Sequence, residues 1–289
     1  MKKKKLAVFG VLGALVLLCA AAAFLLMPPP EASADIEGLL SYRPRDAERI
    51  VYGVSGRGRE LVAWEFGSGQ DVLVLTFCLH GYEDGFPRDG ACLVYTANRL
   101  MESLSRWDLS GWTVYVLPCC NPDGLINGYT NDGPGRCTTA YIRNGAVDFG
   151  SGADINRCFP TGWVKCEDGR NFNGDNPLAC AEAVALADFL AEVRGEGYNF
   201  CIDVHGWYAQ VLTSSGKQGA LYTLFSAAFP ENTWADLNSG TGYLTAWAAM
   251  QGYECCLFEF PPLCDSYDSF VHSGAADRFI ATVKTLING

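Results

Sequence analysis

Apolar runs alternate with segments whose apolar residues recur at helical spacing along most of the chain. Four of these runs are rich in β-branched and aromatic residues, and they predict strands buried on both faces. They cover residues 72–79, 112–117, 200–204 and 253–260. Because strands of this kind are typical of a sheet enclosed by helices, we expect these four to form the core.

Helical patterns lie between the strands. Residues 89–106 carry apolar side chains at positions 93, 97, 100, 101 and 104, which is the spacing of one helix face. A second helix is expected to begin at Asn176 and Pro177, an N-cap followed by proline, and to run to about residue 194. Further helices are predicted at 222–229, 242–250 and 267–286. The alternation predicts a single α/β domain with a mixed, largely parallel multi-stranded sheet and helices on both faces.

The first 34 residues follow a different pattern and are left out of the fold prediction. Four lysines precede an uncharged apolar run at residues 6–27, and Ala32-Ser33-Ala34 forms a small-x-small site before Asp35. This order is typical of a secretory signal peptide. The apolar run is also long enough to remain as an N-terminal membrane anchor with the lysines inside. In both cases we expect residues 35–289 to form an extracytoplasmic domain, secreted or anchored to the membrane.

Composition narrows the class of protein. Hydrophobic residues make up 49% and charged residues 18% of the chain, which excludes a disordered protein. The formal net charge of −11 argues against nucleic acid as a partner, because phosphate binding needs a basic face. Most of the cysteines in apolar runs are expected to be buried thiols. The better disulfide candidates lie in loop-rich or helix-start sequence: Cys137, Cys158, Cys166 and Cys180.

Two of the three histidines occur where predicted strands end. His80 begins the sequence His80-Gly81-Tyr82-Glu83 after the first strand, and His205 directly follows the strand at 200–204. Glu259 lies near the end of the last strand. Functional groups of such sheets collect at the carboxyl ends of the strands. Two histidines and a glutamate are the usual ligands of zinc in peptidases, but one HxxE motif alone is weakly specific.

Further motifs follow in a consistent order and make the pattern specific. They are Asn121-Pro122-Asp123-Gly124, Arg143-Asn144, Asp154-Ile155-Asn156-Arg157-Cys158-Phe159-Pro160, Ile202-Asp203-Val204-His205 and Phe258-Glu259-Phe260-Pro261. Together with the HxxE motif they resemble the zinc carboxypeptidase family, in the branch of bacterial murein-peptide amidases and γ-D-glutamyl-diamino-acid peptidases. The resemblance implies one catalytic Zn²⁺ ion and a peptide substrate, with peptidoglycan stem peptides as the candidate.

The resemblance also implies which residues form the metal centre. His80, Glu83 and His205 would bind the zinc ion. Asp154 would accept a hydrogen bond from the His80 ring and so fix its orientation. Glu259 would act as the general base that takes a proton from water and returns it to the leaving amine.

Substrate-binding residues follow from the same resemblance. Arg143 would face the developing oxyanion, and we prefer it to Arg136 for this role. Asn156 and Arg157 would hold the carboxylate of the substrate. Tyr243 is a candidate for the mobile tyrosine that the family places before the catalytic glutamate.

Other polar residues fit structural roles at least as well. Asn121 and Asp123 are expected to form a turn at the edge of the cleft. Asp203 lies two residues before His205 on the same strand face, which fits either support of the site or a purely structural role. His272 is expected at the surface of the terminal helix.

Two departures from the family pattern bear on the substrate. The digestive carboxypeptidases carry an arginine immediately before the zinc-binding glutamate, where this chain has Tyr82. The residue expected to line the specificity pocket falls near Thr245, whose small polar side chain suits a diamino acid with its own carboxylate and amine. We therefore expect a peptidase that cuts cell-wall peptides next to a diamino acid. A general metallocarboxypeptidase and a catalytically silent wall-binding homologue are the alternatives.

Overall fold

The computed structural model describes residues 34–128, 130, 132–133, 135–149, 152–167, 169–237 and 241–289. The predicted signal peptide or anchor lies outside the described residues, apart from Ala34. Residues 34–289 fold as one unit. Among the described residues, no helix has both the length and the apolar composition needed to cross a bilayer.

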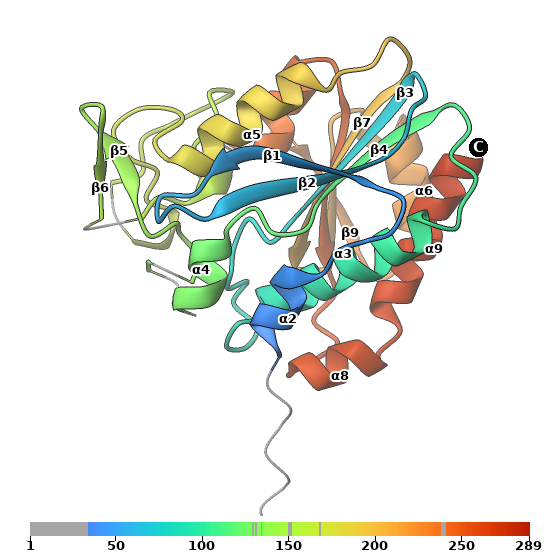
Figure 1. Ribbon diagram of the computed structural model, residues 1–289, viewed down its shortest axis with the longest axis horizontal. Helices are drawn as coiled ribbons and strands as arrows, with labels where there is room; N and C mark the ends of the chain where they lie inside the picture. Colours follow the sequence, from blue (N-terminus) through green and yellow to red (C-terminus); the bar gives the residue numbers. More distant parts are fainter. Residues whose placement is uncertain are drawn as a thin grey trace, which may run out of the picture. The chain divides into compact units, whose positions relative to one another are not determined.

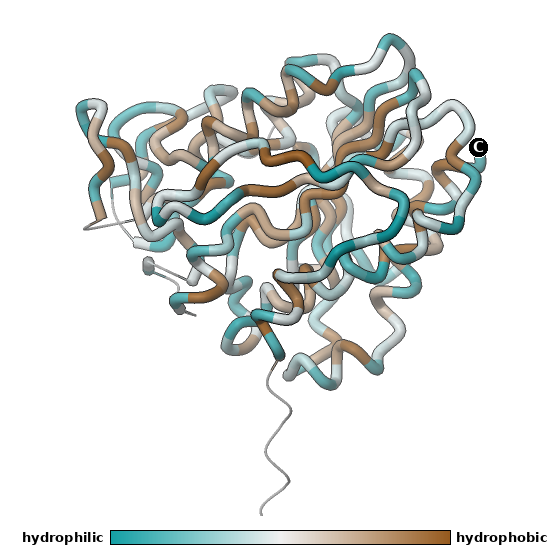
Figure 2. The backbone as a smooth tube through the Cα atoms, in the orientation of Figure 1, coloured by the Kyte–Doolittle hydropathy of each residue, from teal (hydrophilic) through white to brown (hydrophobic). Residues whose placement is uncertain are grey.

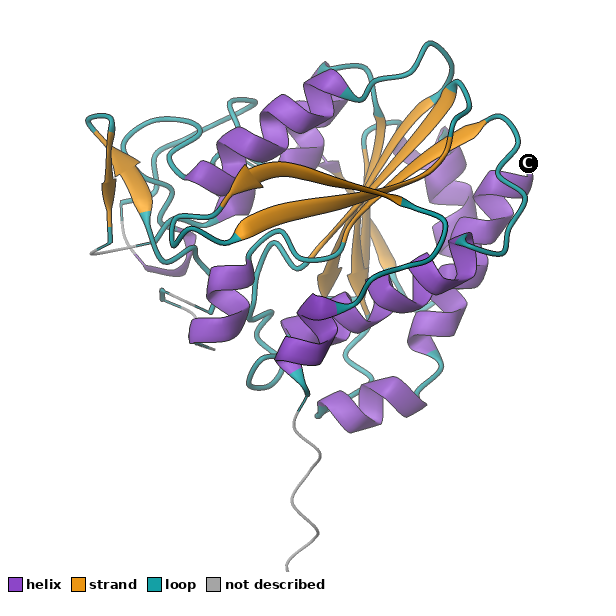
Figure 3. Ribbon diagram, viewed as in Figure 1, coloured by secondary structure: helices purple, strands orange, loops and turns teal. Residues whose placement is uncertain are grey.

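A mixed sheet of eight strands forms the centre of the described structure (Figures 1 and 3), in the order β1-β2-β4-β3-β7-β10-β8-β9. The inner strands β4 (Trp112–Leu117), β3 (Asp71–Phe77), β7 (Asn199–Gly206) and β10 (Glu254–Phe260) run parallel to one another. The outer strands are β1 (Glu48–Val54), β2 (Glu60–Gly67), β8 (Gln210–Thr213) and β9 (Thr233–Asp236). Strands β2 and β8 pair antiparallel to the inner strands. The prediction of a mixed, largely parallel sheet is confirmed.

Alternate side chains of the inner strands face opposite layers of helices. In β3, Leu73 and Leu75 belong to one hydrophobic cluster, whereas Val72 and Val74 belong to the other. The first cluster includes residues of α3 (Gly90–Leu104), α6 (Ala220–Ala228), α8 (Tyr267–His272) and α9 (Ala275–Asn288). The second includes residues of α5 (Ala181–Glu192) and α7 (Leu244–Met250). Figure 2 shows the inner strands as largely hydrophobic, as expected of a sheet covered on both faces.

Smaller elements occupy the connections. Helix α2 (Ile36–Ser41) packs on α3, where the side chain of Asn98 donates to the Leu39 carbonyl at 2.9 Å. Helix α4 (Pro122–Asn127) is capped by the Asn121 side chain, which confirms that residue as a turn former. The long connection between β4 and α5 also contains a separate hairpin of β5 (Tyr141–Arg143) and β6 (Ala146–Asp148), at the left of Figure 1. The short 3₁₀ turns are η1 (Ile155–Arg157), η2 (Gly169–Asn171) and η3 (Gly216–Gln218).

Two predicted helices were wrong at their boundaries, for reasons that lie in the backbone. Helix α5 begins at Ala181, because Leu178 takes a left-handed conformation (φ 57°) and its N–H donates to the Cys158 carbonyl at 2.6 Å. The predicted closing helix is divided into α8 and α9. Gly274 lies between them with φ 77°, a conformation that favours glycine and ends a helix.

The cysteines predicted for disulfides are buried thiols where their bonding is described. Cys137, Cys158 and Cys180 are free and almost fully buried. The Cys158 thiol donates to the Asp154 carbonyl at 3.1 Å, so it helps to hold the turn that carries Asp154. The adjacent cysteine pairs in or just after apolar strands are also buried free thiols, as predicted: Cys119, Cys120, Cys255 and Cys256.

Candidate metal centre and active site

His80, Glu83 and His205 meet at the carboxyl-terminal edge of the inner strands. His80 and Glu83 lie in the connection that follows β3, and His205 lies near the end of β7. The two carboxylate oxygens of Glu83 are 3.0 Å from Nδ1 of His80 and 2.9 Å from Nδ1 of His205. One possible ligand atom of each residue lies within 4.8 Å of the other two. All three side chains are buried.

A buried carboxylate shapes the loop that carries Glu83. Asp89 accepts a hydrogen bond from the Glu83 backbone at 2.6 Å and from the Gly85 backbone at 2.8 Å. Its Oδ2 also accepts from Nε1 of Trp207, the residue two positions after His205, at 2.9 Å. Asp89 therefore ties the loop after β3 to the end of β7, and it holds two parts of the metal centre together.

Each imidazole has its second nitrogen bound by a buried aspartate. Nε2 of His80 lies 2.9 Å from Oδ1 of Asp154, and Nε2 of His205 lies 2.8 Å from Oδ2 of Asp203. A carboxylate accepts, so each Nε2 carries a hydrogen. Each Nδ1 faces the Glu83 carboxylate, and each would offer its lone pair to a metal ion that takes the place of the hydrogen there.

Asn156 links the two imidazole–aspartate pairs. Its backbone N–H donates to Oδ1 of Asp154 at 2.9 Å, and its side-chain nitrogen lies 3.4 Å from Oδ2 of Asp203. Its side-chain oxygen accepts from the Leu244 backbone at 2.9 Å. Thr76 donates to the other oxygen of Asp203 at 2.7 Å. The polar atoms around both histidines therefore form one connected network.

The three ligand residues fit zinc. Two imidazoles and a carboxylate leave a fourth position for water or substrate in catalytic zinc sites. Burial alone would raise the pKa of Glu83, but the neighbouring imidazoles of His80 and His205 outweigh it and lower this pKa to about 2. The Glu83 carboxylate is therefore ionised and available as a ligand at neutral pH.

The metal-binding residues open into a cavity of about 410 Å³, which we call the active-site cavity. Its lining residues are His80, Glu83, Arg136, Asn156, Arg157, Arg170, Asn171, His205, Tyr208, Gln210, Tyr243, Leu257 and Glu259. The structure thus brings together the predicted ligands, the predicted base and the three predicted substrate-binding residues Asn156, Arg157 and Tyr243, but not Arg143.

Glu259 lies beside His205 in the sheet, since the two residues are partners in the register of β10 and β7. Its side chain is partly exposed, and its Oε2 has no hydrogen-bond partner among the described residues. Burial raises the pKa of Glu259 to about 7, against the lowering effect of His205. A carboxyl group that titrates near neutral pH can both accept and release a proton.

Arg157 and Tyr243 form one wall of the active-site cavity. The guanidinium carbon of Arg157 lies 4.6 Å from the centre of the Tyr243 ring. One guanidinium nitrogen also donates to the Asn156 carbonyl at 2.8 Å. Tyr243 directly precedes α7, so this wall is built from η1 and the start of that helix.

The structure contradicts the prediction that Arg143 faces the metal centre. Arg143 belongs to the β5–β6 hairpin, is about half exposed, and has its Nε 3.7 Å from the Asp148 carboxylate and 3.8 Å from that of Asp175. It lines a different cavity, together with residues of the long connection and with Arg57 from the turn between β1 and β2. The expectation for Thr245 was also wrong, because this side chain is fully buried and contributes no surface to a pocket.

Arg136 is the arginine that reaches the metal centre. Its side chain is 6% exposed, and its guanidinium nitrogens lie 3.5 Å from Asp154 and 4.0 Å from Glu83. Its Nε has no hydrogen-bond partner among the described residues. The irregular connection after α4 places residue 136 inward and residue 143 outward, a distinction that counting along the chain did not make.

The sequence did not identify some residues of the site and left the role of others undecided. Asp203 was a candidate for supporting the site because it shares a strand face with His205, and the structure shows that it contacts this ligand. His272 is exposed, as predicted. Arg170 and Asn171 line the active-site cavity, but they come from an irregular segment with no periodic pattern that could have pointed to them.

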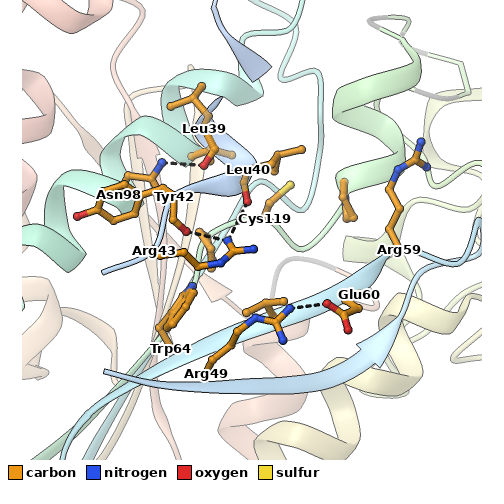
Figure 4. A pocket seen from close by; sticks show the side chains of 14 residues that line it. Leu39, Leu40, Tyr42, Arg43, Arg49, Arg59, Glu60, Trp64, Asn98 and Cys119 are labelled. Atoms are coloured by element: carbon orange, nitrogen blue, oxygen red, sulfur yellow. Dashed lines mark hydrogen bonds and ion pairs between the residues drawn. The ribbon is translucent and has the colours of Figure 1, made fainter. Parts of the chain in front are cut away.

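Another cavity, of about 290 Å³, lies between α2, β2 and α3 (Figure 4), and we call it the α2 cavity. Its walls are mostly apolar, and three arginines surround it. All three have partners within the protein: Arg43 donates to a backbone carbonyl at the end of α2, Arg49 pairs with Glu60, and Arg59 pairs with buried Asp123.

The family comparison agrees with the geometry of the metal centre. The model of the family described as zinc carboxypeptidase matches residues 34–234 of this chain, which is well over half of it. The chain therefore belongs to the zinc carboxypeptidase family, a family of zinc metallopeptidases.

One relative and two solved structures show which proteins this chain is similar to. Bacteriocin BCN5 of Clostridium perfringens is 35% identical over 246 residues, which cover 84% of this chain but only 26% of that protein. The structure of carboxypeptidase A from Helicoverpa armigera matches with a TM-score of 0.65 and 16% identity, over 87% of this chain and 71% of that one. Murein-tripeptide amidase MpaA from Escherichia coli O157 matches with a TM-score of 0.55 and 20% identity, over 87% and 95%. These structural likenesses confirm the α/β fold.

Proposed function

We propose that this chain is an extracytoplasmic zinc peptidase that hydrolyses cell-wall peptides next to a diamino acid. The observation that carries the proposal is the lining of the active-site cavity. In a protein with a net charge of −11, this cavity combines a zinc-binding trio, Glu259 and the guanidinium groups of Arg136, Arg157 and Arg170. Three guanidinium groups suit a substrate with several carboxylates near the scissile bond, and peptidoglycan stem peptides around a diamino acid have this character.

Glu259 is the proton-transfer group of the proposed reaction. Bound zinc supplies Lewis acidity toward the scissile carbonyl and lowers the pKa of water. Glu259 takes a proton from the attacking water and passes it to the leaving nitrogen. Its unpartnered Oε2 is the atom available for this transfer.

The arginines divide the binding of substrate between them. Arg136 is fixed by Asp154 and Glu83, and its free Nε–H is a donor for the negative charge that develops on the carbonyl oxygen. Arg157, stacked on Tyr243, binds the carboxylate of the leaving diamino acid. Asn156 lines the cavity but has its side-chain oxygen bound to Leu244, so its main contribution is to position Arg157 and the metal ligands.

The pattern of residues 1–34 supports the extracytoplasmic setting. A cleaved signal peptide would give a mature protein that begins near Asp35, whereas a retained anchor would keep the full mass in the membrane fraction. Cell fractionation with intact-mass measurement distinguishes the two. Recovery of the full-length protein from the cytosol alone would overturn this part of the proposal.

The substrate is tested by incubating residues 35–289 with muropeptides and, separately, with ordinary peptides that have free C-termini. We expect mass spectrometry to detect release of the diamino acid from muropeptides, and the matched Glu259→Gln protein to release none. Cleavage of ordinary peptides alone would instead support a general metallocarboxypeptidase, which the carboxypeptidase A fold also fits. Zinc binding without turnover of either substrate would indicate a silent wall-binding homologue.

A further inference from the structure

Tyr243 lies in the wall of the active-site cavity on a backbone segment that hydrogen bonds hold on both sides. The residue before it, Gly242, makes two backbone hydrogen bonds, of 3.0 and 3.2 Å, to the segment just after η1. The residue after it, Leu244, donates from its backbone to Oδ1 of Asn156 at 2.9 Å. The Tyr243 carbonyl accepts from the Trp247 backbone at 3.1 Å, within α7. The backbone of Tyr243 is therefore fixed to η1, the turn that carries the arginine of the same wall.

Gly242 allows these two segments to come into close contact. It has a φ of 66°, and a Cβ at this position would overlap the backbone carbonyl of Arg157. Both the conformation and the close approach require glycine. Tyr243 is thus held beside Arg157 by backbone packing as well as by hydrogen bonds.

The ring of Tyr243 lies against the guanidinium group of Arg157. The guanidinium carbon is 4.6 Å from the centre of the ring, and one guanidinium nitrogen donates to the Asn156 carbonyl at 2.8 Å. The face of an aromatic ring attracts a cation at such a distance. These two contacts restrict a side chain that otherwise has many rotamers, and they leave most of its five N–H donors for a ligand.

Arg157 also differs in its partners from the other arginines of the active-site cavity. Arg136 lies 3.5 Å from the Asp154 carboxylate, and Arg170 pairs with Asp84. Within the part of the chain that the structure describes, Arg157 forms no ion pair with a carboxylate, and its polar partner is a backbone carbonyl. Of these three guanidinium groups, that of Arg157 is therefore the best placed to bind the carboxylate of a ligand.

A moving Tyr243 would break these contacts. The family resemblance made this residue a candidate for the mobile tyrosine. Movement of its hydroxyl toward a substrate would take the ring off the guanidinium of Arg157, while the bonds of Gly242 and Leu244 keep the backbone in place. The contacts therefore favour a fixed ring over a moving hydroxyl.

We propose that Tyr243 is a positioning residue, whose ring holds the Arg157 guanidinium in the orientation that binds a carboxylate of the substrate. Its hydroxyl takes no part in binding or in proton transfer. This inference rests on the proposed function for the role of Arg157, and it applies to any substrate with a carboxylate at that wall. Because the ring reduces the freedom that the arginine loses on binding, its removal should weaken binding and leave the chemical step almost unchanged.

Binding of succinate, a small dicarboxylate, tests this role without any turnover. Isothermal titration calorimetry is carried out on the zinc-loaded protein of residues 35–289. Wild type is compared with Tyr243→Phe, Tyr243→Leu, Arg157→Gln and the double variant of Tyr243→Leu and Arg157→Gln. The control is Tyr198→Leu, because Tyr198 is 73% exposed and lies at the opposite end of β7 from His205.

We expect Tyr243→Leu to raise the dissociation constant for succinate by about 3–30-fold, the value of a cation–π contact. Tyr243→Phe keeps the ring and should stay within about 2-fold of wild type, as should the control Tyr198→Leu. Arg157→Gln should raise the constant by about 10–100-fold. Adding Tyr243→Leu to Arg157→Gln should change it by less than about 2-fold further, because the two residues act as one unit.

Kinetics on each peptide that the wild type hydrolyses separate binding from chemistry. Tyr243→Leu should raise KM and change kcat by less than about 3-fold. A large loss of kcat in Tyr243→Phe would show that the hydroxyl takes part in the reaction, and it would overturn the inference.

These measurements distinguish the role of Tyr243 from the proposed function. Absence of muropeptide hydrolysis, with the expected succinate affinities, overturns the proposed function and supports the role of Tyr243. Muropeptide hydrolysis with equal succinate affinities in wild type and Tyr243→Leu overturns the role of Tyr243 and leaves the wall-peptidase proposal intact. If wild type does not bind succinate, or if Arg157→Gln binds it equally well, Arg157 is not the carboxylate-binding residue and the inference is overturned.

Discussion

The active-site cavity and the α2 cavity are both surrounded by three arginines, yet only one of them is equipped for chemistry. In both cavities each arginine has a partner within the protein, and Figure 4 shows those of Arg43 and Arg49 in the α2 cavity. The active-site cavity contains buried polar atoms without a partner among the described residues, on Glu259, Arg136 and Asn171. None of the unpartnered buried atoms recorded for the described residues belongs to the lining of the α2 cavity.

This difference shows what distinguishes a functional cavity from a structural one. Buried polar groups are nearly always hydrogen-bonded, because leaving one unpaired costs about 1–3 kcal/mol. Several such groups next to a metal-binding trio indicate partners that arrive with a substrate. Arginine content alone does not, since paired guanidinium groups also stabilise an ordinary surface groove.

We expect the largest effect on kcat from a substitution in the active-site cavity, and almost none from a substitution in the α2 cavity. Replacing Glu259 with Gln removes the proton-transfer group but keeps the shape of the side chain, so kcat should fall by about 10²–10⁴-fold with zinc still bound. Arg49→Gln in the α2 cavity should change kcat by less than about 2-fold. Steady-state kinetics with metal analysis tests both, and equal losses in the two proteins would remove the distinction between the cavities.

A second contrast sets Arg136 against Arg143. Because Arg136 has a donor free at the metal centre and Arg143 lies on the exposed hairpin, Arg136→Gln should lower kcat by about 10²–10³-fold, whereas Arg143→Gln should stay within about 3-fold. Kinetics on one substrate, with circular dichroism to verify folding, makes the measurement. A larger loss for Arg143→Gln would restore the role that the sequence suggested for it.

Asp203 acts through His205, so its effect should appear first in metal binding. Asp203→Asn keeps the volume of the side chain but weakens the hydrogen bond to Nε2 of His205, and the dissociation constant for zinc should rise by about 10–100-fold. Competition with a chromogenic chelator measures this constant without any substrate. The exposed Asp277→Asn protein is the control, and unchanged affinity in Asp203→Asn would make Asp203 purely structural.

Glu182 provides a stability counterpart to Glu259, since burial raises the pKa of both carboxyl groups to about 7. Glu182 lies in α5, with Oε1 accepting from the Gly56 backbone and Oε2 without a partner among the described residues. The folded state binds the proton of Glu182 more tightly than the unfolded state, in which the carboxyl group has its ordinary pKa of 4.5. The contribution of Glu182 to stability is therefore lost as pH rises from about 4.5 through about 7.

Glu182→Gln should remove the loss of stability that Glu182 causes as pH rises. We expect the free energy of unfolding to increase by about 1–3 kcal/mol at pH 8 and by little at pH 5, because the ionised carboxylate is the form that burial disfavours. Urea denaturation at the two pH values measures the difference. A stabilisation of equal size at both pH values would show that ionisation is not its cause.

The sequence predicted those parts of the molecule that depend on local pattern. The inner strands, the predicted zinc ligands and Glu259 sit in or just after buried apolar runs, so their placement follows from the order of strands in a parallel sheet. The hairpin of β1 and β2 was not predicted, and the exposed or half-exposed residues of β1 show no clear alternation. Arg136 and Arg170 could not be placed either, because the direction of a side chain in an irregular connection depends on tertiary contacts.

The loop between Arg157 and Asn173 is closed at its base. The Asn173 side chain donates to the Arg157 carbonyl at 3.0 Å and to the Val164 carbonyl at 2.9 Å, and accepts from the Cys166 backbone at 2.8 Å. Because these hydrogen bonds hold the base of the loop, residues at its tip can be exchanged while the turn at Asp154 keeps its position. Grafting loops of other lengths between these two anchors would then give proteins that keep the same zinc centre but line the active-site cavity with different residues.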